Sequence, residues 1–457
     1  MRAVDHTQMA FASALLSLAL SASAVAAQTG PDANGVTAPS IASSLPGNGD
    51  PSGARNDLAA RGITYDLYYT NDLLANVHGG LKRGAIDQGK LEGALTVDLQ
   101  KAMGLHGLTL FANAFQLHNT GRMRRDYVGG INTIAAIEAV PATRLSELWL
   151  EQKFLDGKAT LRVGQLAADV EFFFSGISTM FLQSDWATIT ALNHPSGGPA
   201  YPLSTPGVRL KYDPAPDVTL QAAVYNGDPA GPGDGDPQLR NHHGLNFRVK
   251  DPALVIAEAQ LRANTDAKNA GLARTFKVGV WGHFGWFDDQ RFANDGRLLA
   301  DPAGSGVAIR HKGNSGVYGV IEQQLYRPAG AAADGGISVF SRISASPSDR
   351  NPVDFFLDGG IVFAGLVPRR LNDKFGASLM YAGFSDRLRA FDRDFAAFNR
   401  GGRARDFESN LEFNYQAEIV PGWILQPNMQ FVWHPSENAP QKTSDAMVVG
   451  IRSFWHY

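Results

Sequence analysis

The chain has 457 residues and a formal net charge of −3, because its 44 acidic residues nearly balance its 41 lysines and arginines. Both signs are spread along the chain without a basic tract, so the sequence gives no indication of nucleic-acid binding. The chain contains no cysteine, which excludes a disulfide framework and a thiolate metal site.

Residues 1–27 have the form of a secretory signal peptide. Arg2 supplies a sparse positive start, the stretch from Met9 to Val25 is apolar, and small residues precede a cleavage point at Ala27 or Gln28. A membrane anchor is the competing interpretation, but the run is barely long enough to span a bilayer. We therefore expect export. No later apolar run reaches the length of a spanning helix, so a membrane domain would have to be a closed barrel.

Residues 28–61 are rich in Gly, Pro, Ala, Ser and Asn and show no periodicity over most of their length. Such a composition predicts a flexible lead-in on the periplasmic side. Its last part, ARNDLAAR at 54–61, could form a short helix that ends at Gly62.

Alternation of apolar and polar residues dominates the chain from residue 62 to residue 457. In the run 407–419 one parity holds Phe407, Leu411, Phe413, Tyr415, Ala417 and Ile419, and the other holds Glu408, Asn410, Glu412, Asn414, Gln416 and Glu418. Alternation over about ten residues is typical of strands with one face in lipid and one in a wet lumen. We therefore predict an all-β fold, a single closed transmembrane antiparallel β-barrel over residues 62–457.

The number of strands follows from the periodic runs. They lie at 62–75, 90–99, 107–118, 145–155, 158–168, 206–213, 217–226, 244–251, 254–263, 274–285, 315–326, 336–345, 354–365, 373–384, 407–419, 423–434 and 446–457. These are seventeen runs, whereas bacterial barrels of this type have an even number of strands. The runs 244–251 and 254–263 keep one phase across Asp251 and Pro252, so we interpret them as one strand bent at the proline, which gives sixteen.

The dipeptide Asp156-Gly157 predicts a tight hairpin turn, because both positions accept a positive φ. The resulting register places Trp149 opposite Gly164. Parity then places four side chains inside the pore: Glu147, Trp149, Glu151 and Arg162. An indole face can pack against the apolar face of a sugar ring while charged groups bond its hydroxyls, so these residues are candidates for solute binding.

Trp149 and the Glu151–Arg162 pair each have a purely structural alternative role. Trp149 could fill space in the barrel wall beneath an infolded loop. Glu151 lies opposite Arg162 in the predicted register, and opposite charges on one face of a sheet commonly serve only to stabilise it.

Two long segments between strands are candidates for narrowing the lumen. The 119–144 segment carries Arg122, Arg124 and Arg125, which would supply hydrogen-bond donors to a constriction if the segment folds inward, and would otherwise be a solvated charge run. The 169–205 segment is too apolar for a freely exposed loop, and we expect it to pack inside the barrel.

Several segments resemble the carbohydrate-selective porins of the OprB type, and the resemblance covers nearly the whole chain after residue 27. The segments are RLSELWLEQKFLDGKATLRVGQ at 144–165, PSGGPAYPLSTPGVRLKY at 195–212, VYNGDPAGPG at 224–233, FDDQRF at 287–292, SPSDRN at 346–351 and YQAEIVPGWILQPNMQFVWHP at 415–435. One departure is the last residue, Tyr457, where most members carry phenylalanine. A last strand that ends on an aromatic residue resembles the signal that the barrel assembly machinery recognises, and we expect Tyr457 to serve in this way.

This resemblance implies a sixteen-stranded porin in the outer membrane of a Gram-negative bacterium, with a narrowed lumen that favours glucose-like monosaccharides and other small solutes. The expected partners are sugars, outer-membrane lipid and the assembly machinery, with a monomer or a homotrimer as the assembly. No catalytic motif, cofactor or metal site is expected.

Two other functions remain open from the sequence. A general or anion-preferring pore is suggested by Arg122, Arg124, Arg125, Arg162, Arg209, Arg248 and Arg262. Against it stand the inward acids Glu147, Glu151, Glu258, Glu408, Glu412 and Glu418, since mixed charge favours hydroxyl recognition over ion selection. The second is a non-conducting structural or adhesive barrel, which the apolar 169–205 segment would allow.

Overall fold

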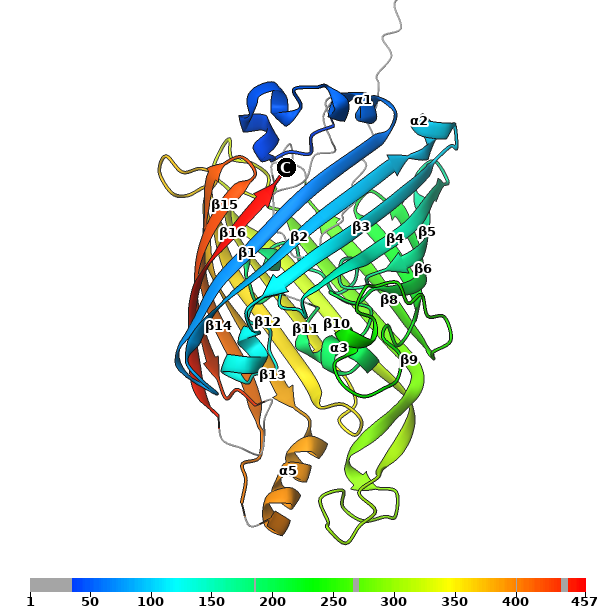
Figure 1. The fold of residues 1–457 in the computed structure, drawn as a ribbon, viewed down its shortest axis with the longest axis vertical. Coiled ribbons are helices and arrows are strands. Elements are labelled where there is room, and N and C mark those ends of the chain that lie inside the picture. The colour runs from blue at the N-terminus through cyan, green and yellow to red at the C-terminus, as the bar shows by residue number, and fades with distance from the viewer. Residues whose placement is uncertain (1–34, 185, 266–270, 400, 437–442) are drawn as a thin grey trace, which may run out of the picture.

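The computed structural model describes residues 35–184, 186–265, 271–399, 401–436 and 443–457. Within these residues sixteen antiparallel strands close into one barrel, in which β1 pairs with both β2 and β16 (Figure 1). The strands are β1 (Ile63–Gly80), β2 (Gly84–Asp98), β3 (Leu108–Asn119), β4 (Ala142–Phe154), β5 (Ala159–Leu166), β6 (Thr205–Ala215), β7 (Val218–Asn226), β8 (Ala253–Ala263), β9 (Arg274–Ala293), β10 (Ala308–Tyr326), β11 (Gly336–Ala345), β12 (Val353–Ala364), β13 (Lys374–Phe384), β14 (Phe407–Val420), β15 (Trp423–Trp433) and β16 (Ser444–His456). The predicted fold class and strand number are confirmed.

The helices are short and lie outside the strands. They are η1 (Ile41–Ser44), η2 (Pro46–Gly49), α1 (Ala54–Ala60), α2 (Leu99–Met103), η3 (Met123–Val128), η4 (Ser178–Met180), α3 (Thr188–Leu192), η5 (Pro195–Gly197), α4 (Pro237–Arg240) and α5 (Asp386–Asn399). In the described part of the chain no helix has the length and apolar character needed to cross a membrane.

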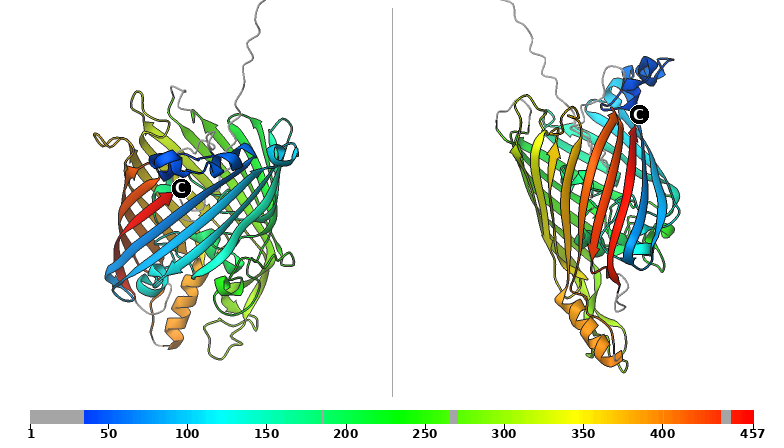
Figure 2. Two further views of the ribbon diagram at one scale, coloured as in Figure 1. Left: turned by 45° about the horizontal axis from the view of Figure 1, so that its top comes forward. Right: turned by 90° about the vertical axis from the view of Figure 1, so that its left-hand side faces the viewer.

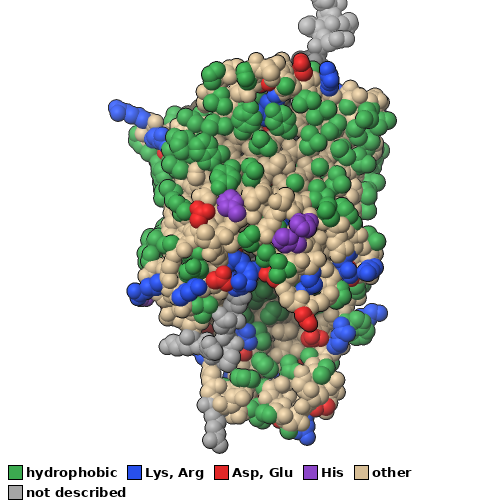
Figure 3. All heavy atoms as spheres, in the orientation of Figure 1, with side chains coloured by type: hydrophobic (Ala, Val, Ile, Leu, Met, Phe, Trp, Pro, Cys, Tyr) green, Lys and Arg blue, Asp and Glu red, His purple; other side chains and the backbone are tan. Residues whose placement is uncertain are grey.

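The alternation of each strand separates an apolar outer face from a polar inner face. On β14 the polar parity is buried, with Glu408, Asn410 and Glu412 all fully shielded from solvent, whereas Phe413 is exposed. Hydrophobic side chains gather over the strands on the face shown in Figure 3, and most of its lysines and arginines gather toward the end that carries the long loops. The outer face is therefore suited to lipid and the inner face to hydrogen bonding.

One strand interpretation was wrong. Residues 244–251 form no strand, and β8 begins only at Ala253, after Pro252. The neighbouring strand β7 ends at Asn226, which pairs with Ala253, so no ladder remains for the preceding residues. Leu245, Phe247 and Val249 are nevertheless 61%, 48% and 79% exposed. The alternation of this segment indicates which side chains face outward, but it does not show that the segment pairs with a neighbouring strand.

The hairpin of β9 and β10 is longer than the runs 274–285 and 315–326 predicted. It projects beyond the rest of the barrel, beside α5, at the end opposite the described N-terminal helices (Figures 1 and 2). Arg291 of β9 and Asp394 of α5 form an ion pair of 2.7 Å that joins the hairpin to the helix. Short turns lie at the other end of the barrel, which identifies that end as periplasmic and the projecting end as extracellular.

The register of the β4–β5 hairpin is as predicted. Trp149 lies opposite Gly164, and Glu151 lies opposite Arg162. The strands end at Phe154 and resume at Ala159, and the Lys158 N–H donates to the Leu155 carbonyl at 3.0 Å, which closes the turn around Asp156 and Gly157 as predicted. Leu155, Asp156 and Gly157 all have positive φ, of 53°, 51° and 83°.

Residues 35–61 are folded against the periplasmic end of the barrel, although the sequence suggested a flexible lead-in. The buried Arg55 of α1 holds this segment, because its Nε donates to the Gly35 carbonyl at 3.1 Å and its Nη2 donates to the Tyr65 carbonyl at 2.8 Å. Its guanidinium lies 4.7 Å from the ring centre of Tyr65 and 5.1 Å from that of Tyr457. Tyr65 belongs to β1 and Tyr457 follows β16, so Arg55 stabilises the seam, the place where the first and last strands meet.

Replacing Arg55 with alanine is expected to lower the free energy of unfolding by about 2 kcal/mol, because hydrogen bonds from a buried charged group and its contacts with two rings are lost. The measurement is the temperature at which the barrel loses its compact migration on a gel. The exposed Arg61, at the end of the same helix, provides the control Arg61→Ala. Equal unfolding temperatures for the two variants would contradict the proposed stabilisation of the barrel by Arg55.

Candidate functional site: a lumen narrowed by two loops

Segment 167–204, between β5 and β6, lies inside the barrel. Its Phe172, Phe173 and Trp186 are at most 4% exposed and belong to one core cluster with inward residues of the wall such as Tyr225 and Trp281. The apolar side chains of this segment, which were conspicuous in the sequence, therefore pack against the inner face of the barrel wall.

Wall glutamates satisfy the backbone of this segment. Glu258 of β8 accepts the Phe173 N–H at 2.9 Å, and Glu322 of β10 accepts the Ile177 N–H at 3.2 Å. Glu412 of β14 accepts the Leu182 N–H at 2.8 Å and the Gln183 N–H at 3.0 Å. A buried backbone amide must find an acceptor, and here the polar parity of the strands provides it.

Segment 120–141, between β3 and β4, is held in the same way. Glu408 of β14 accepts the backbone N–H groups of Ile131 at 2.8 Å and Asn132 at 2.7 Å, and Gln430 of β15 donates to the Ile134 carbonyl at 2.8 Å. Several of the inward acids that the sequence set against an anion pore are thus hydrogen-bonded to infolded loops and do not face open solvent.

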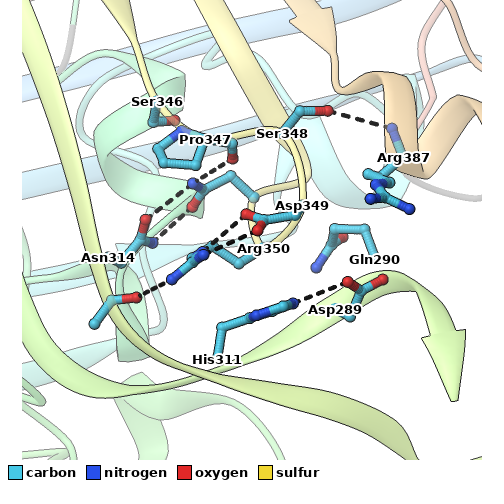
Figure 4. Close-up of polar contacts among 12 residues, drawn as sticks. Asp289, Gln290, His311, Asn314, Ser346, Pro347, Ser348, Asp349, Arg350 and Arg387 are labelled. Atoms are coloured by element: carbon cyan, nitrogen blue, oxygen red, sulfur yellow. Dashed lines mark hydrogen bonds and ion pairs between the residues drawn. The ribbon is translucent and has the colours of Figure 1, made fainter. Parts of the chain in front are cut away.

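At the extracellular end of the barrel, polar contacts join the loop 346–351 to β9 and β10 (Figure 4), and Asn314 of β10 also reaches segment 167–204. The motifs FDDQRF and SPSDRN, which carried part of the resemblance, meet there, and the Gln290 N–H donates to the Asp349 carbonyl at 2.9 Å. Asn314 of β10 donates to Asn351 at 2.7 Å and to the carbonyl of Asn193, in the infolded segment, at 3.2 Å. Arg350 donates to the Gly313 carbonyl at 2.7 Å, which ties the SPSDRN loop to the start of the same strand.

The two infolded segments bound a cavity of about 750 Å³. Its polar lining includes Arg122, Arg124, Arg125, Glu138, Asp169, His194, Tyr201, Asp236, Gln238, Arg342 and Arg452, and its apolar lining includes Ile131, Ile134, Phe174, Phe181 and Trp186. A cavity of this size, with an apolar lining and convergent polar groups, falls in the range that holds small organic molecules.

Each of the five arginines that line the cavity has a carboxylate partner. The distances between guanidinium nitrogen and carboxylate oxygen are 2.8 Å for Arg122 with Asp236, 3.7 Å for Arg124 with Glu138, 2.7 Å for Arg125 with Asp126 and 2.6 Å for Arg452 with Asp72, and Arg342 pairs with Asp358. The lining therefore offers many hydrogen-bonding groups while its charges are largely balanced.

Two aromatic residues of segment 167–204 add to this lining without adding charge. Burial lowers the pKa of His194 to about 3, with a further contribution from His283, so its imidazole is neutral at physiological pH. The ring centre of His194 lies 5.5 Å from that of Trp186, whose indole N–H donates to the Phe172 carbonyl at 3.1 Å.

The structure separates the seven candidate residues into two groups. Arg122, Arg124 and Arg125 line the cavity, in or beside η3, whereas Glu147, Trp149, Glu151 and Arg162 are absent from its lining. Trp149 is 3% exposed and stacks with Phe111 of β3, at 4.8 Å between ring centres. The guanidinium of Arg162, from the strand on the other side, lies 3.7 Å from its ring centre.

Glu171 of segment 167–204 brings the second group into a buried charge cluster. Its carboxylate accepts from Arg162 at 2.5 Å and from Arg209 at 2.6 Å, and Arg209 also donates to Glu151 at 2.7 Å. Burial alone would raise the pKa of Glu171, but the two arginines outweigh it and hold that pKa below its ordinary value. Glu151, Arg162 and Arg209 thus fasten the beginning of the infolded segment to the wall, and the Glu147 carboxylate accepts the Ala167 N–H at 3.2 Å.

Sequence reasoning missed Arg342 and Arg452 as lining residues. Both lie on the inward parity of their strands, β11 and β16, so parity together with charge could have found them. It expected the apolar segment that contains Trp186 to narrow the lumen, but it left out His194 and Tyr201 as lining residues, because the path of an infolded loop is not visible in a periodic pattern.

The family comparison agrees with this architecture. The family model described as carbohydrate-selective porin, OprB family, matches residues 82–457. The chain belongs to this family. It is therefore a porin of the Gram-negative outer membrane, and its family is described as carbohydrate-selective.

Individual porins are distant from this chain in sequence but similar to it over most of their length. Porin B of Pseudomonas aeruginosa is 24% identical over 430 residues, which cover 88% of this chain and 89% of that protein. The putative porin QuiX of Acinetobacter baylyi is 24% identical over 432 residues, covering 88% and 91%. The high-pH structure of Pseudomonas putida OprB has a TM-score of 0.76 at 19% identity, and covers 89% of this chain and 97% of that chain, which shows a shared fold.

Proposed function

We propose that this porin lets glucose-like monosaccharides and other small neutral solutes diffuse passively into the periplasm, and that the cavity between segments 120–141 and 167–204 is its constriction. Solutes pass unchanged, without catalysis or a cofactor. The observation that carries the proposal is the pairing of every lining arginine with a carboxylate. Such a lining can bond hydroxyl groups while it gives little preference to either sign of ion.

Arg122, Arg124 and Arg125 are the proposed donors to solute hydroxyls. Their side chains are 14%, 27% and 45% exposed, so each keeps part of its surface on the cavity while paired. Arginine presents five N–H groups, and a carboxylate partner uses only some of them. Glu147, Trp149, Glu151 and Arg162 contribute indirectly, because they hold the wall and the infolded segment in place.

Liposome swelling tests this function. Liposomes that contain the protein are expected to swell faster in glucose than in a disaccharide, an amino acid or a sugar phosphate at equal osmolarity. Faster swelling with the sugar phosphate would favour an anion-preferring pore. Absence of both swelling and ionic conductance would favour a non-conducting barrel.

Replacing Trp149 with alanine is expected to destabilise the barrel by about 3–5 kcal/mol, as for other buried aromatic side chains. The sugar block of ion current through the channels that fold should remain unchanged, because Trp149 packs between Phe111 and Arg162 and not on the cavity. Unfolding temperature and current block are measured on the same preparation. A several-fold weaker block with normal stability would instead establish Trp149 as a sugar-stacking residue.

A further inference from the structure

We propose that Glu258, Glu322 and Glu412 are positioning residues that set the size limit of the pore. They come from strands β8, β10 and β14, and each accepts hydrogen bonds from segment 167–204. The inference rests on the proposed function, because it treats the cavity beside this segment as the constriction.

The anchored amides lie next to the residues that line the cavity. Phe174 lies between Phe173, held by Glu258, and Ser175, whose hydroxyl donates to Glu322 at 2.7 Å. The lining residue Thr179 is two positions from the anchored Ile177. A shift of an anchor therefore moves the lining directly.

The third anchor has the same arrangement. The lining residues Phe181 and Ser184 flank Leu182 and Gln183, both held by Glu412. Met180, one position before Phe181, accepts a hydrogen bond from Asn414 through its carbonyl at 2.8 Å, so β14 holds this turn from two positions. The lining here is fixed to the wall by hydrogen bonds at successive residues.

The chemistry of Glu412 makes it the most sensitive anchor. Its Oε1 accepts the Leu182 N–H and its Oε2 accepts the Gln183 N–H, so both oxygens are required. A glutamine of the same shape would turn its NH₂ group toward one of these N–H groups, donor against donor. Glu322 differs, because Oε1 alone accepts from both Ser175 and Ile177, and a glutamine could keep that oxygen in place.

Two of the three wall carboxylates, those of Glu258 and Glu412, are buried, which separates this role from direct solute binding. Glu258 is 4% exposed and Glu412 is fully buried. Neither belongs to the lining of the cavity, whereas the loop residues that they hold do. They act on the solute through the loop.

The test compares Glu412→Gln with the wild type in planar bilayers and in swelling liposomes. Glu412→Gln should raise the open-channel conductance and raise the swelling rate for a disaccharide relative to glucose, while Glu322→Gln should change both less. Glu418→Gln is the matched control, because Glu418 lies on the same strand and parity but bonds Asn372, outside segment 167–204. It should behave like the wild type.

The outcomes separate the two proposals. A wild type that neither conducts nor admits glucose ends the proposed function. A conducting wild type together with a Glu412→Gln variant of unchanged conductance and unchanged sugar ratio overturns the positioning role, even if that variant unfolds at a lower temperature. If Glu412→Gln gives no folded barrel, Glu412→Asp decides. It keeps both acceptor oxygens on a shorter arm, and should still raise conductance by drawing the segment toward β14.

Discussion

Replacing Asp72 with alanine is expected to lower the free energy of unfolding by about 3–5 kcal/mol, since it leaves a buried arginine without its partner. Asp72 of β1 and Arg452 of β16 are directly opposite each other in the seam of the barrel. Two hydrogen bonds of 2.6 and 2.9 Å join them, and they are 0% and 6% exposed. The measurement is the temperature or denaturant concentration at which the barrel loses its compact gel migration.

A partly exposed ion pair provides the control for Asp72→Ala. Arg291 and Asp394 lie 2.7 Å apart, with side chains 30% and 17% exposed, outside the barrel wall. Asp394→Ala should cost at most about 1 kcal/mol, because water screens such pairs and solvates the remaining charge. Equal losses in the two variants would contradict the importance of the seam pair. Since Arg452 also lines the cavity, Asp72→Ala channels that do fold should gain anion preference.

Replacing Tyr457 with lysine is expected to reduce the folded barrel in the outer membrane severely while export across the inner membrane stays normal. The Tyr457 N–H donates to the Leu67 carbonyl at 2.8 Å and its carbonyl accepts the Leu67 N–H at 2.9 Å, which completes the seam. Its hydroxyl donates to the Gly49 carbonyl at 2.6 Å. A lysine removes the aromatic ring that Arg55 contacts and that we propose the assembly machinery recognises.

Tyr457→Phe separates the ring from the hydroxyl. It keeps the aromatic character and loses only the bond to Gly49, so it should assemble nearly as well as the wild type. Membrane fractions are compared by the amount of heat-modifiable barrel. A normal amount for Tyr457→Lys would show that the last residue carries no assembly signal.

The fold could be predicted because each strand alternates between two very different environments. The same pattern misled at residues 244–251, where Leu245, Phe247 and Val249 are exposed like lipid-facing residues of a strand although the segment pairs with no neighbour. It also shortened β9 and β10, whose hairpin continues beyond the residues that alternate clearly. Periodicity reports the side on which a residue lies, whereas pairing depends on whether a neighbouring strand reaches that level.

The residues that line the cavity were harder to predict from the sequence than the fold was. Parity correctly placed Glu412 and Trp149 inside the barrel, but it could not say whether an inward side chain meets the solute or the back of a loop. That distinction depends on contacts such as the one between Glu412 and Leu182, which are far apart in the sequence. Arg122, Arg124 and Arg125 were found because three arginines in one long loop are conspicuous.

The long sequence separation between each infolded loop and the strand that holds it determines when the lining of the cavity can form. Leu182 and Glu412 are 230 residues apart, and Ile131 and Glu408 are 277 residues apart, so both loops are fastened by a strand that enters near the end of the sequence. Neither fastening can form before β14 is in place, because both acceptor carboxylates belong to that strand. A barrel that stalls before β14 is inserted would lack these fastenings, so only the finished molecule is a selective filter. Incomplete assembly would then threaten the cell by leakage as well as by loss of transport.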